Sequence, residues 1–332
     1  MGYFYLSAAH KSSGKTTLSI GLCAAFSGEH GLTVQPFKKG PDYIDPLWLA
    51  AAAGRPCFNL DVFMESPEAN RRLFQRHMPG ADIGIIEGNK GLFDGISTDG
   101  SDSNAAMAGL LGAPVILVID TRGMTRGIAP LLHGYATFDT EVGIAGVILN
   151  QVGGARHEAK LRAAVETYTD IPVVGAVRKN RDLVIDERHL GLMPSNEHRE
   201  ARRIIERIAA AIADGVDLDR VRAIADTAPA IDAADVPIDF PDPDVTIGIP
   251  KDAAFGFYYA GDLEALREAG AQIVWFDAIE DGALPAVDGL FIGGGFPETQ
   301  MQALEANRAM REDIRDFVES GGPVYAECGG LM

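Results

Sequence analysis

The interpretation of this sequence depends on one stretch near its start, Ala9-His10-Lys11-Ser12-Ser13-Gly14-Lys15-Thr16. It fits the P-loop pattern G-x-x-x-x-G-K-[ST], except that Ala9 replaces the first glycine. An apolar run at residues 3–8 precedes it, and a helical pattern at residues 17–26 follows it. In this setting backbone N–H groups form an anion nest, Lys15 reaches the terminal phosphates and the Thr16 hydroxyl can hold Mg²⁺. We therefore predict a nucleotide site made by Ser12, Ser13, Gly14, Lys15, Thr16 and Thr17.

Short apolar runs alternate with helical stretches through the first two thirds of the chain. We expect strands at residues 3–8, 33–37, 83–86, 115–119, 144–149 and 173–177. These runs carry few polar residues, as is typical of strands covered on both faces. A further helix is expected at residues 197–213, with Ser195 and Asn196 as capping candidates. The alternation predicts an α/β fold built on a P-loop, doubly wound parallel sheet.

The composition changes after that helix. Residues 227–244 contain four prolines, five aspartates and no basic residue, which is typical of an exposed, semi-rigid linker. A second α/β pattern follows, with strands expected at residues 246–249, 272–276, 289–292 and 323–326 and helices at 261–269 and 306–319. We therefore expect a P-loop domain at residues 1–226, a linker at 227–244 and part of a second α/β domain at 245–332.

The charge balance excludes several classes of protein. The formal net charge is −18, which argues against binding to nucleic acid and to anionic membranes. No apolar run is long enough for a spanning helix, and the N-terminus lacks the features of a signal peptide. The three cysteines are far apart, so we expect a cytoplasmic protein without disulfides. Five of only eight lysines, however, fall in the first 90 residues, where an anionic ligand would need them.

Acidic residues follow two of the expected strands. The segment Lys38–Pro46 reads KKGPDYIDP, and its two carboxylates, Asp42 and Asp45, suit Mg²⁺. The alternative is that both aspartates cap the next helix. Glu87 ends a strand next to the P-loop, as the acid of a Walker-B motif does, and Asp94 lies either in the site or in a turn.

Two further positions are candidates for ligand binding and catalysis. Asn150 ends a strand and either reads a purine edge or forms an Asx-turn. Cys328 lies in Ala326-Glu327-Cys328-Gly329-Gly330, after an expected strand and among small residues, as a sharp nucleophile turn requires. We predict that Cys328 is a nucleophile rather than a core cysteine, with backbone N–H groups of Gly293–Gly295 as an oxyanion hole.

Taken together, these motifs resemble the cobyrinic acid a,c-diamide synthases and their close relatives, and the resemblance covers essentially the whole chain. It rests on the P-loop, KKGPDYIDP at 38–46, NLD at 59–61, EGNKGLFDG at 87–95, ERHLGL at 187–192, GGGFPE at 293–298 and YAECGGLM at 325–332. The resemblance implies a synthetase domain built like dethiobiotin synthetase, followed by a class I glutamine amidotransferase domain.

The resemblance also implies a mechanism and its residues. ATP phosphorylates a carboxylate of a tetrapyrrole polycarboxylate, such as the a and c acetates of cobyrinic acid, and ammonia from glutamine displaces the phosphate. Thr16, Asp45 and Glu87 are the implied Mg²⁺ ligands, Lys15 and Lys38 neutralise charge, and Asp42 and Asp94 line the reaction site. The catalytic candidates are then Cys328, Lys38, Asp42, Asp45 and Asp94, and His189 is a candidate for facing the substrate.

The second domain departs from the family pattern in one respect. A cysteine nucleophile needs a base, which in the family is a histidine well downstream. Here the sequence ends four residues after Cys328, and no histidine follows His198. We therefore expect these 332 residues to hold only the N-terminal part of a glutaminase, to hydrolyse glutamine poorly and to use free ammonium.

Three alternatives remain at this point. The sequences HKSSGKTT and EGNKG also resemble the branch that amidates sirohaem or a related isobacteriochlorin, and Arg122, Arg126 and Arg188 are candidate clamps for the substrate carboxylates. A partition-type P-loop ATPase would carry a signature lysine where His10 stands and would bind DNA or membrane, which the charge disfavours. Dethiobiotin synthetase itself needs no glutaminase segments. A homodimer is left open.

Overall fold

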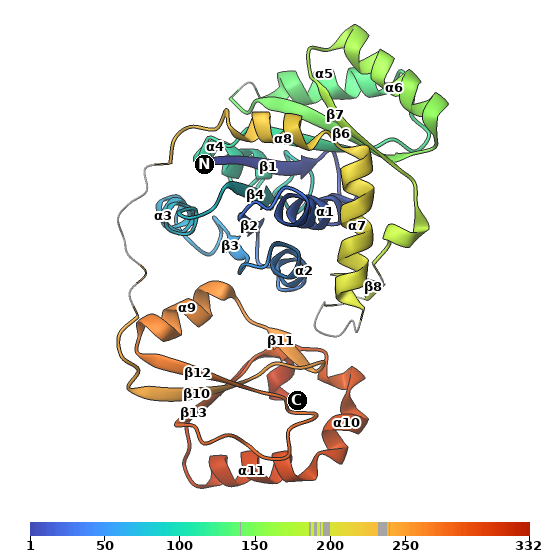
Figure 1. Cartoon of the computed structure of the whole chain (residues 1–332). Helices are drawn as coiled ribbons and strands as arrows, with labels where there is room; N and C mark the ends of the chain where they lie inside the picture. The colour runs from blue at the N-terminus through green and yellow to red at the C-terminus, as the bar shows by residue number, and fades with distance from the viewer. Residues whose placement is uncertain are drawn as a thin grey trace. The chain divides into compact units, whose positions relative to one another are not determined.

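The structure is a computed structural model that describes residues 1–139, 141–185, 187–188, 191–192, 194, 200–231, 238 and 240–332. The chain divides into two compact units. The first unit holds residues 1–192 and 200–231, and the second holds residues 240–332 (Figure 1). Part of the predicted linker at 227–244 lies outside the described residues, so its boundaries stay predictions.

The first unit is built on a parallel sheet of seven strands. In chain order they are β1 (Gly2–Ala8), β2 (Val34–Lys39), β3 (Phe58–Leu60), β4 (Ile83–Glu87), β5 (Val115–Asp120), β6 (Ile144–Val152) and β7 (Val173–Arg178). Their order in the sheet is β3-β2-β4-β1-β5-β6-β7. From β1 the chain runs outward through β2 and β3 on one side and returns to β4 beside β1. It then runs outward through β5, β6 and β7 on the other side, which confirms the predicted doubly wound α/β fold.

Helices connect these strands. They are α1 (Lys15–Gly28), α2 (Ile44–Ala53), α3 (Pro67–His77), α4 (Asn104–Leu111), α5 (Ile128–Phe138), α6 (Ala155–Tyr168), α7 (Ala201–Gly215) and α8 (Leu218–Ala225). The predicted apolar stripe of α1 is buried, since Leu18, Leu22 and Phe26 are almost fully covered. Helix α1 packs against α7 and α2 (Figure 1). This packing anchors the helix whose first turn follows the P-loop.

Two elements differ from the sequence-based expectation. Strand β3 was not expected, because its three residues are too few to show a periodic pattern. It pairs with β2 alone, as an edge strand. The helix expected at residues 197–213 is α7, Ala201–Gly215, and the proposed caps Ser195 and Asn196 lie outside the described residues. The short strands β8 (Glu187–Arg188) and β9 (Gly191–Leu192) pair antiparallel before α7.

The second unit has its own parallel sheet, ordered β12-β10-β13-β15. Its strands are β10 (Val245–Pro250), β12 (Ala271–Phe276), β13 (Gly289–Ile292) and β15 (Val324–Ala326). The helices are α9 (Ala260–Glu268), α10 (Met301–Ala306) and α11 (Arg308–Glu319), and two short strands, β11 (Phe255–Phe257) and β14 (Gly294–Gly295), pair antiparallel. Phe276, Leu290 and Met310 form its core. The α/β pattern expected after residue 244 is therefore confirmed.

None of the helices in the described part of the chain is long and apolar enough to cross a membrane.

Candidate functional site

The P-loop joins the carboxyl end of β1 to the first turn of α1. Gly14 lies immediately before the helix with φ = 88°, a left-handed conformation that favours glycine. A Cβ at this position would also lie 2.2 Å from Asn150 Nδ2, so there is no room for a side chain. That amide nitrogen donates a hydrogen bond to the Ser13 carbonyl at 2.8 Å. Glycine is thus required here both by the backbone and by the neighbouring strand β6.

The contact made by Asn150 was not anticipated by either interpretation of its sequence position. Its side chain is buried, and its amide nitrogen supports the P-loop across the sheet. It forms no Asx-turn there, and recognition of a purine by Asn150 stays a prediction.

The other P-loop residues lie at the start of α1. Ser12 is exposed and adopts φ = 63°, while Ser13 is buried and donates its hydroxyl to the His10 carbonyl at 2.7 Å. Burial lowers the pKa of Lys15 to about 8, although Glu87 opposes this shift. The Thr16 and Thr17 side chains are half-buried at the first turn. A buried lysine and a helix N-terminus together favour a phosphate ligand.

A buried ion cluster lies beside this loop. Lys38, at the end of β2, contacts Asp45 directly, and its Nζ lies 2.8 Å from Glu87 Oε1 and 3.7 Å from Asp42 Oδ2. The Thr16 hydroxyl lies 2.7 Å from Glu87 Oε1 and 3.1 Å from Asp45 Oδ2. The fold therefore brings together residues up to 71 positions apart, from α1, β2, α2 and β4. Parallel strands end at the same edge, which is why these loops meet.

The charged groups in this cluster shift one another's pKa values. Burial alone would lower the pKa of Lys38, but the surrounding carboxylates raise it well above its usual value. Burial would raise the pKa of Asp45, but Lys38 and hydrogen bonds lower it. Burial also raises the pKa of Glu87, and it raises that of Asp42 to about 6 with help from Asp45. Such opposed shifts are typical of functional sites.

The two aspartates of the Lys38–Pro46 loop do different things. Asp42 Oδ1 accepts hydrogen bonds from the backbone N–H groups of Ile44 and Asp45, at 2.8 and 3.1 Å. Asp42, which precedes the N-cap residue Tyr43, therefore satisfies the first two backbone N–H groups of α2. Asp45 turns its carboxylate to Lys38 and Thr16 instead.

The carboxylate and hydroxyl oxygens of this cluster are of the kind that Mg²⁺ prefers. Glu87 Oε2 is buried and has no hydrogen-bond partner, so it is an oxygen available to a cation. Among the described residues no group of three or more His, Cys, Asp and Glu side chains gathers as a metal site. Mg²⁺, however, is commonly held by one or two carboxylates with phosphate and water oxygens. Thr16, Asp45 and Glu87 supply such a partial set.

The carboxylates that contact Lys38 are those of Asp42, Asp45 and Glu87, whereas the charge of Asp94 acts on Lys15, whose pKa it raises against the effect of burial. The Asp94 side chain is exposed and accepts the Gly91 N–H at 3.1 Å, as a turn residue does. The structure adds a residue that the sequence did not reveal: Tyr135 on α5, whose hydroxyl donates to the Ala9 carbonyl at the start of the P-loop. Phe93, next to Asp94, packs against Tyr135. No local pattern marks Tyr135, because its partner is 126 residues away.

Cys328 belongs to the second unit and lies just after β15. It is exposed, and its φ of 48° is left-handed, a strained conformation found at nucleophile turns. A Cβ placed on Gly294 would lie 3.3 Å from Cys328 Sγ, so the glycine segment closely approaches the thiol. The Gly293 N–H, one of the predicted oxyanion donors, donates to the Tyr258 hydroxyl at 3.2 Å, and the oxyanion hole stays a prediction.

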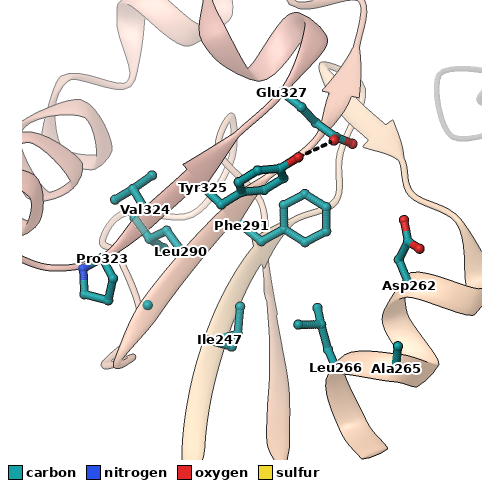
Figure 2. A pocket seen from close by; sticks show the side chains of 11 residues that line it. Ile247, Asp262, Ala265, Leu266, Leu290, Phe291, Pro323, Val324, Tyr325 and Glu327 are labelled. Carbon is teal, nitrogen blue, oxygen red and sulfur yellow. Dashed lines mark hydrogen bonds between the residues drawn. The ribbon is translucent and has the colours of Figure 1, made fainter. Parts of the chain in front are cut away.

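A cavity of about 590 Å³ lies on the sheet of the second unit, and Glu327, the residue before Cys328, is part of its lining. Figure 2 shows Phe291 and Tyr325 on its wall, with Leu266 and Asp262 of α9 opposite. The Tyr325 hydroxyl donates to Glu327 at 3.1 Å at one end of the cavity (Figure 2). The lining is mainly apolar, so this cavity suits hydrocarbon rather than charge.

The predicted carboxylate clamps are already engaged in the structure where they are described. Arg122 donates to both oxygens of the buried Asp120, and Arg126 lies 4.9 Å over the Tyr168 ring. The side chains of Arg188 and His189 lie outside the described residues.

Comparison with protein families matches both units. Residues 8–192 match the CobQ/CobB/MinD/ParA nucleotide binding domain, and residues 246–332 match the CobB/CobQ-like glutamine amidotransferase domain. The chain therefore contains a nucleotide-binding domain and an amidotransferase domain.

Several curated proteins align along almost the whole chain. The cobyrinate a,c-diamide synthase of Magnetococcus marinus is 49% identical over 99% of this chain and 72% of its own length. Those of Dehalococcoides mccartyi and Methanosarcina barkeri are 42% and 44% identical, over 97% and 98% of this chain and 70% and 69% of theirs. Among solved structures, FlhF complexed with GTP/Mg(2+) is 12% identical with a TM-score of 0.41, covering 54% of this chain and 66% of that one.

Proposed function

Since the chain belongs to the family of cobyrinate a,c-diamide synthases, we propose that its substrate is cobyrinic acid or a closely related corrin precursor. The enzyme is a ligase with glutamine as its nitrogen donor. On this proposal it converts the a and c acetates of the macrocycle to amides at the expense of ATP. The shared edge of the first sheet, where Lys15, Thr16, Lys38, Asp45 and Glu87 meet, is the observation that supports it most.

The reaction needs two steps because ammonia does not displace hydroxide from a carboxylate. A substrate carboxylate oxygen attacks the γ-phosphorus of ATP, and the bond from that phosphorus to ADP breaks. Ammonia then attacks the acyl carbon of the resulting acyl phosphate, loses a proton and expels inorganic phosphate. In both steps the phosphate oxygens bear negative charge, and they would lie at the carboxyl ends of β1, β2 and β4.

The residues of the first unit have separate roles in this scheme. Lys15 and the P-loop N–H groups bind the phosphates, and Lys38 counters charge near the transferred group. Thr16, Asp45 and Glu87 would hold Mg²⁺, which when bound neutralises phosphate charge and aligns the transfer. The orphan oxygen Glu87 Oε2 supports this assignment. Asp42 and Asp94 border the same edge, where the substrate carboxylate would enter.

Exposed apolar side chains in the same unit offer a surface for the ring of the macrocycle. Phe63 and Met64 follow the carboxyl end of β3, and Ile96 follows that of β4. The Ile96 N–H is bonded to Asp102, whose carbonyl accepts a hydrogen bond from Lys39 at the end of β2. We place the macrocycle over these loops, with its carboxylates turned toward the P-loop.

Release of ammonia from glutamine is assigned to the second unit. The exposed Cys328 thiol, the strained turn that carries it and the close approach of Gly294 support its role as the nucleophile. The need for ATP and the absence of disulfides support a cytoplasmic enzyme. A homodimer stays a prediction.

The proposal is tested by measuring ATP consumption with ammonium or glutamine across a panel of tetrapyrrole carboxylates. Cobyrinic acid and sirohaem are both in the panel, and amidation is read by mass. We expect ammonium-dependent amidation of cobyrinic acid with stoichiometric ADP, and its loss in Lys15→Met. If sirohaem is amidated and cobyrinic acid is not, the substrate is sirohaem instead of a corrin precursor. ATPase activity that needs DNA or lipid but no tetrapyrrole would overturn the proposed function.

A further inference from the structure

Asn59 belongs to the NLD segment, for which no role has yet been given. It lies on the edge strand β3, opposite Lys38 of β2 in the sheet. Its half-buried side chain donates two hydrogen bonds from Nδ2, to the carbonyl oxygens of Gly40 and Asp42, both at 2.8 Å. One amide group thus holds two points of the loop that leads from β2 to α2.

That loop carries the acidic residues of the ion cluster. It leaves β2 through Gly40, whose φ of 93° is left-handed and whose N–H donates to the Leu60 carbonyl at 2.9 Å. Two residues later the Asp42 side chain accepts the backbone N–H of Asp45 at 3.1 Å. The chain of contacts therefore runs from Asn59 through the Asp42 backbone to the position of the Asp45 carboxylate.

Asparagine is well suited to this place. Its amide carries two N–H donors on one nitrogen, which matches two converging carbonyl oxygens. Aspartate has nearly the same shape but no donor when ionised, so its carboxylate would repel both carbonyls. Strand β3 has three residues and one neighbouring strand, so the backbone ladder alone fixes the loop weakly.

We propose that Asn59 is a positioning residue that places Asp42 and Asp45 relative to Thr16 and Glu87, and so sets the affinity of the nucleotide site for its divalent cation. This inference rests on the proposed function, because it takes Asp45 and Glu87 as cation ligands. Asn59 itself contacts neither the cation nor the substrate. Its effect is transmitted by the loop backbone.

The chain offers a matched control. Asn70 on α3 also donates from Nδ2 to backbone carbonyls, those of Asp61, Glu65 and Ser66, at 3.1, 3.3 and 3.0 Å. It is more deeply buried than Asn59, but it braces the loop after β3 rather than the acidic loop. Removing its side chain should lower stability without moving Asp45.

The experiment uses the full chain as wild type, Asn59→Ala, Asn59→Asp and Asn70→Ala. Binding of Mn²⁺ is measured by electron paramagnetic resonance with a non-hydrolysable ATP analogue, and nucleotide binding is measured separately in EDTA. Loss of two hydrogen bonds to the loop should weaken Mn²⁺ binding about tenfold in Asn59→Ala and further in Asn59→Asp. Nucleotide binding in EDTA should stay within about twofold of wild type in both.

The outcomes separate the positioning role of Asn59 from the existence of the cation site. Asn70→Ala should lower the melting temperature at least as much as Asn59→Ala while binding Mn²⁺ as wild type does. If all variants bind Mn²⁺ like wild type, the positioning role is overturned and the cation site stands. If wild type itself binds no Mn²⁺ with nucleotide, the cation part of the proposed function fails, and this inference fails with it.

Discussion

At the scale of single residues, Lys38 is the centre of the site. Its side chain is 3% exposed and lies among three carboxylates, of which Glu87 is fully buried. A buried charge is tolerated only when it is paired, and here each partner depends on the same ammonium group. The site is therefore sensitive to any change that removes this one cation.

The first prediction follows from that dependence. Lys38→Met leaves Asp45 and Glu87 without their main counter-charge, so the free energy of unfolding of the first unit should fall by about 3–5 kcal/mol at neutral pH. Urea denaturation followed by circular dichroism measures the loss. Arg202→Met is the control, because Arg202 and Glu206 are largely exposed and their pair contributes at most about 0.5 kcal/mol. Equal losses in the two variants would contradict a buried cluster.

The second prediction concerns pH. His77 on α3 stacks on Phe58 at 3.5 Å, and burial, followed by repulsion from Arg76 and Arg55, lowers its pKa to about 4. Between pH 6.5, the usual histidine value, and pH 4 the unfolded chain binds more protons than the folded one. Stability contributed by neutral His77 is therefore complete above pH 6.5 and is lost as the pH falls through this window.

The measurement is the free energy of unfolding as a function of pH for wild type, His77→Gln and His133→Gln. His77→Gln should flatten the fall between pH 6.5 and 4. The control replaces an exposed histidine on α5 and should keep the wild-type slope. A wild-type slope in His77→Gln would show that other groups cause the acid dependence.

At the scale of elements, the packing of α1 is what holds the P-loop in place. Gly21 lies in the middle of α1 where α7 crosses it, and a Cβ there would lie 2.2 Å from Ile212 Cγ1 and 2.9 Å from Ile208 Cγ2. The close approach of α7 requires glycine at this position, although glycine has a low helix propensity. Contact with α7 thus outweighs the local preference of the helix.

The third prediction uses two matched substitutions. Gly21→Ala should destabilise the first unit by about 1–3 kcal/mol, because overpacking against α7 exceeds the gain in helix propensity. Gly134→Ala, inside α5 with no atom within 4 Å of the added Cβ, should stabilise it by about 0.5–1 kcal/mol. Thermal and urea unfolding give both signs. Stabilisation by Gly21→Ala would mean that α1 and α7 are not packed as described.

At the scale of the whole molecule, the two units present their thiols differently. Cys23 and Cys57 are buried in the first unit, and burial raises the pKa of both thiols, while Cys328 in the second unit is exposed. The thiolate is the reactive form of cysteine. Burial therefore protects Cys23 and Cys57 in two ways, because it blocks access to the sulfur and raises the thiol pKa.

The fourth prediction is that iodoacetamide alkylates Cys328 alone in the native protein. Peptide mass mapping should find Cys23 and Cys57 modified only after denaturant is added. Cys328→Ser should abolish native labelling and leave the denatured pattern of the other two unchanged. Labelling of Cys23 or Cys57 at the rate of Cys328 would contradict the described interior of the first unit.

Much of this organisation could be predicted from the sequence. The P-loop, the apolar runs that became β1, β4, β5 and β6, and the second α/β pattern are each local, because strands, helices and turns are encoded over neighbouring residues. Lys15, Thr16, Asp45 and Glu87 can be predicted for the same reason, since each ends a strand or lies in the first turn of a helix. The roles of these side chains remain proposals.

The tertiary structure decided what no local pattern contains. It placed Lys38 between carboxylates from two other segments, directed the Asn150 amide to the P-loop backbone rather than to open space, and joined Tyr135 to Ala9. The tertiary structure also contains the three-residue strand β3, and the Asn59 side chain on this strand is hydrogen-bonded to the loop between β2 and α2. Hydrogen bonds and charge pairs between distant segments form only when the sheet aligns their ends, so the sequence determined which groups were present and the fold determined which of them meet.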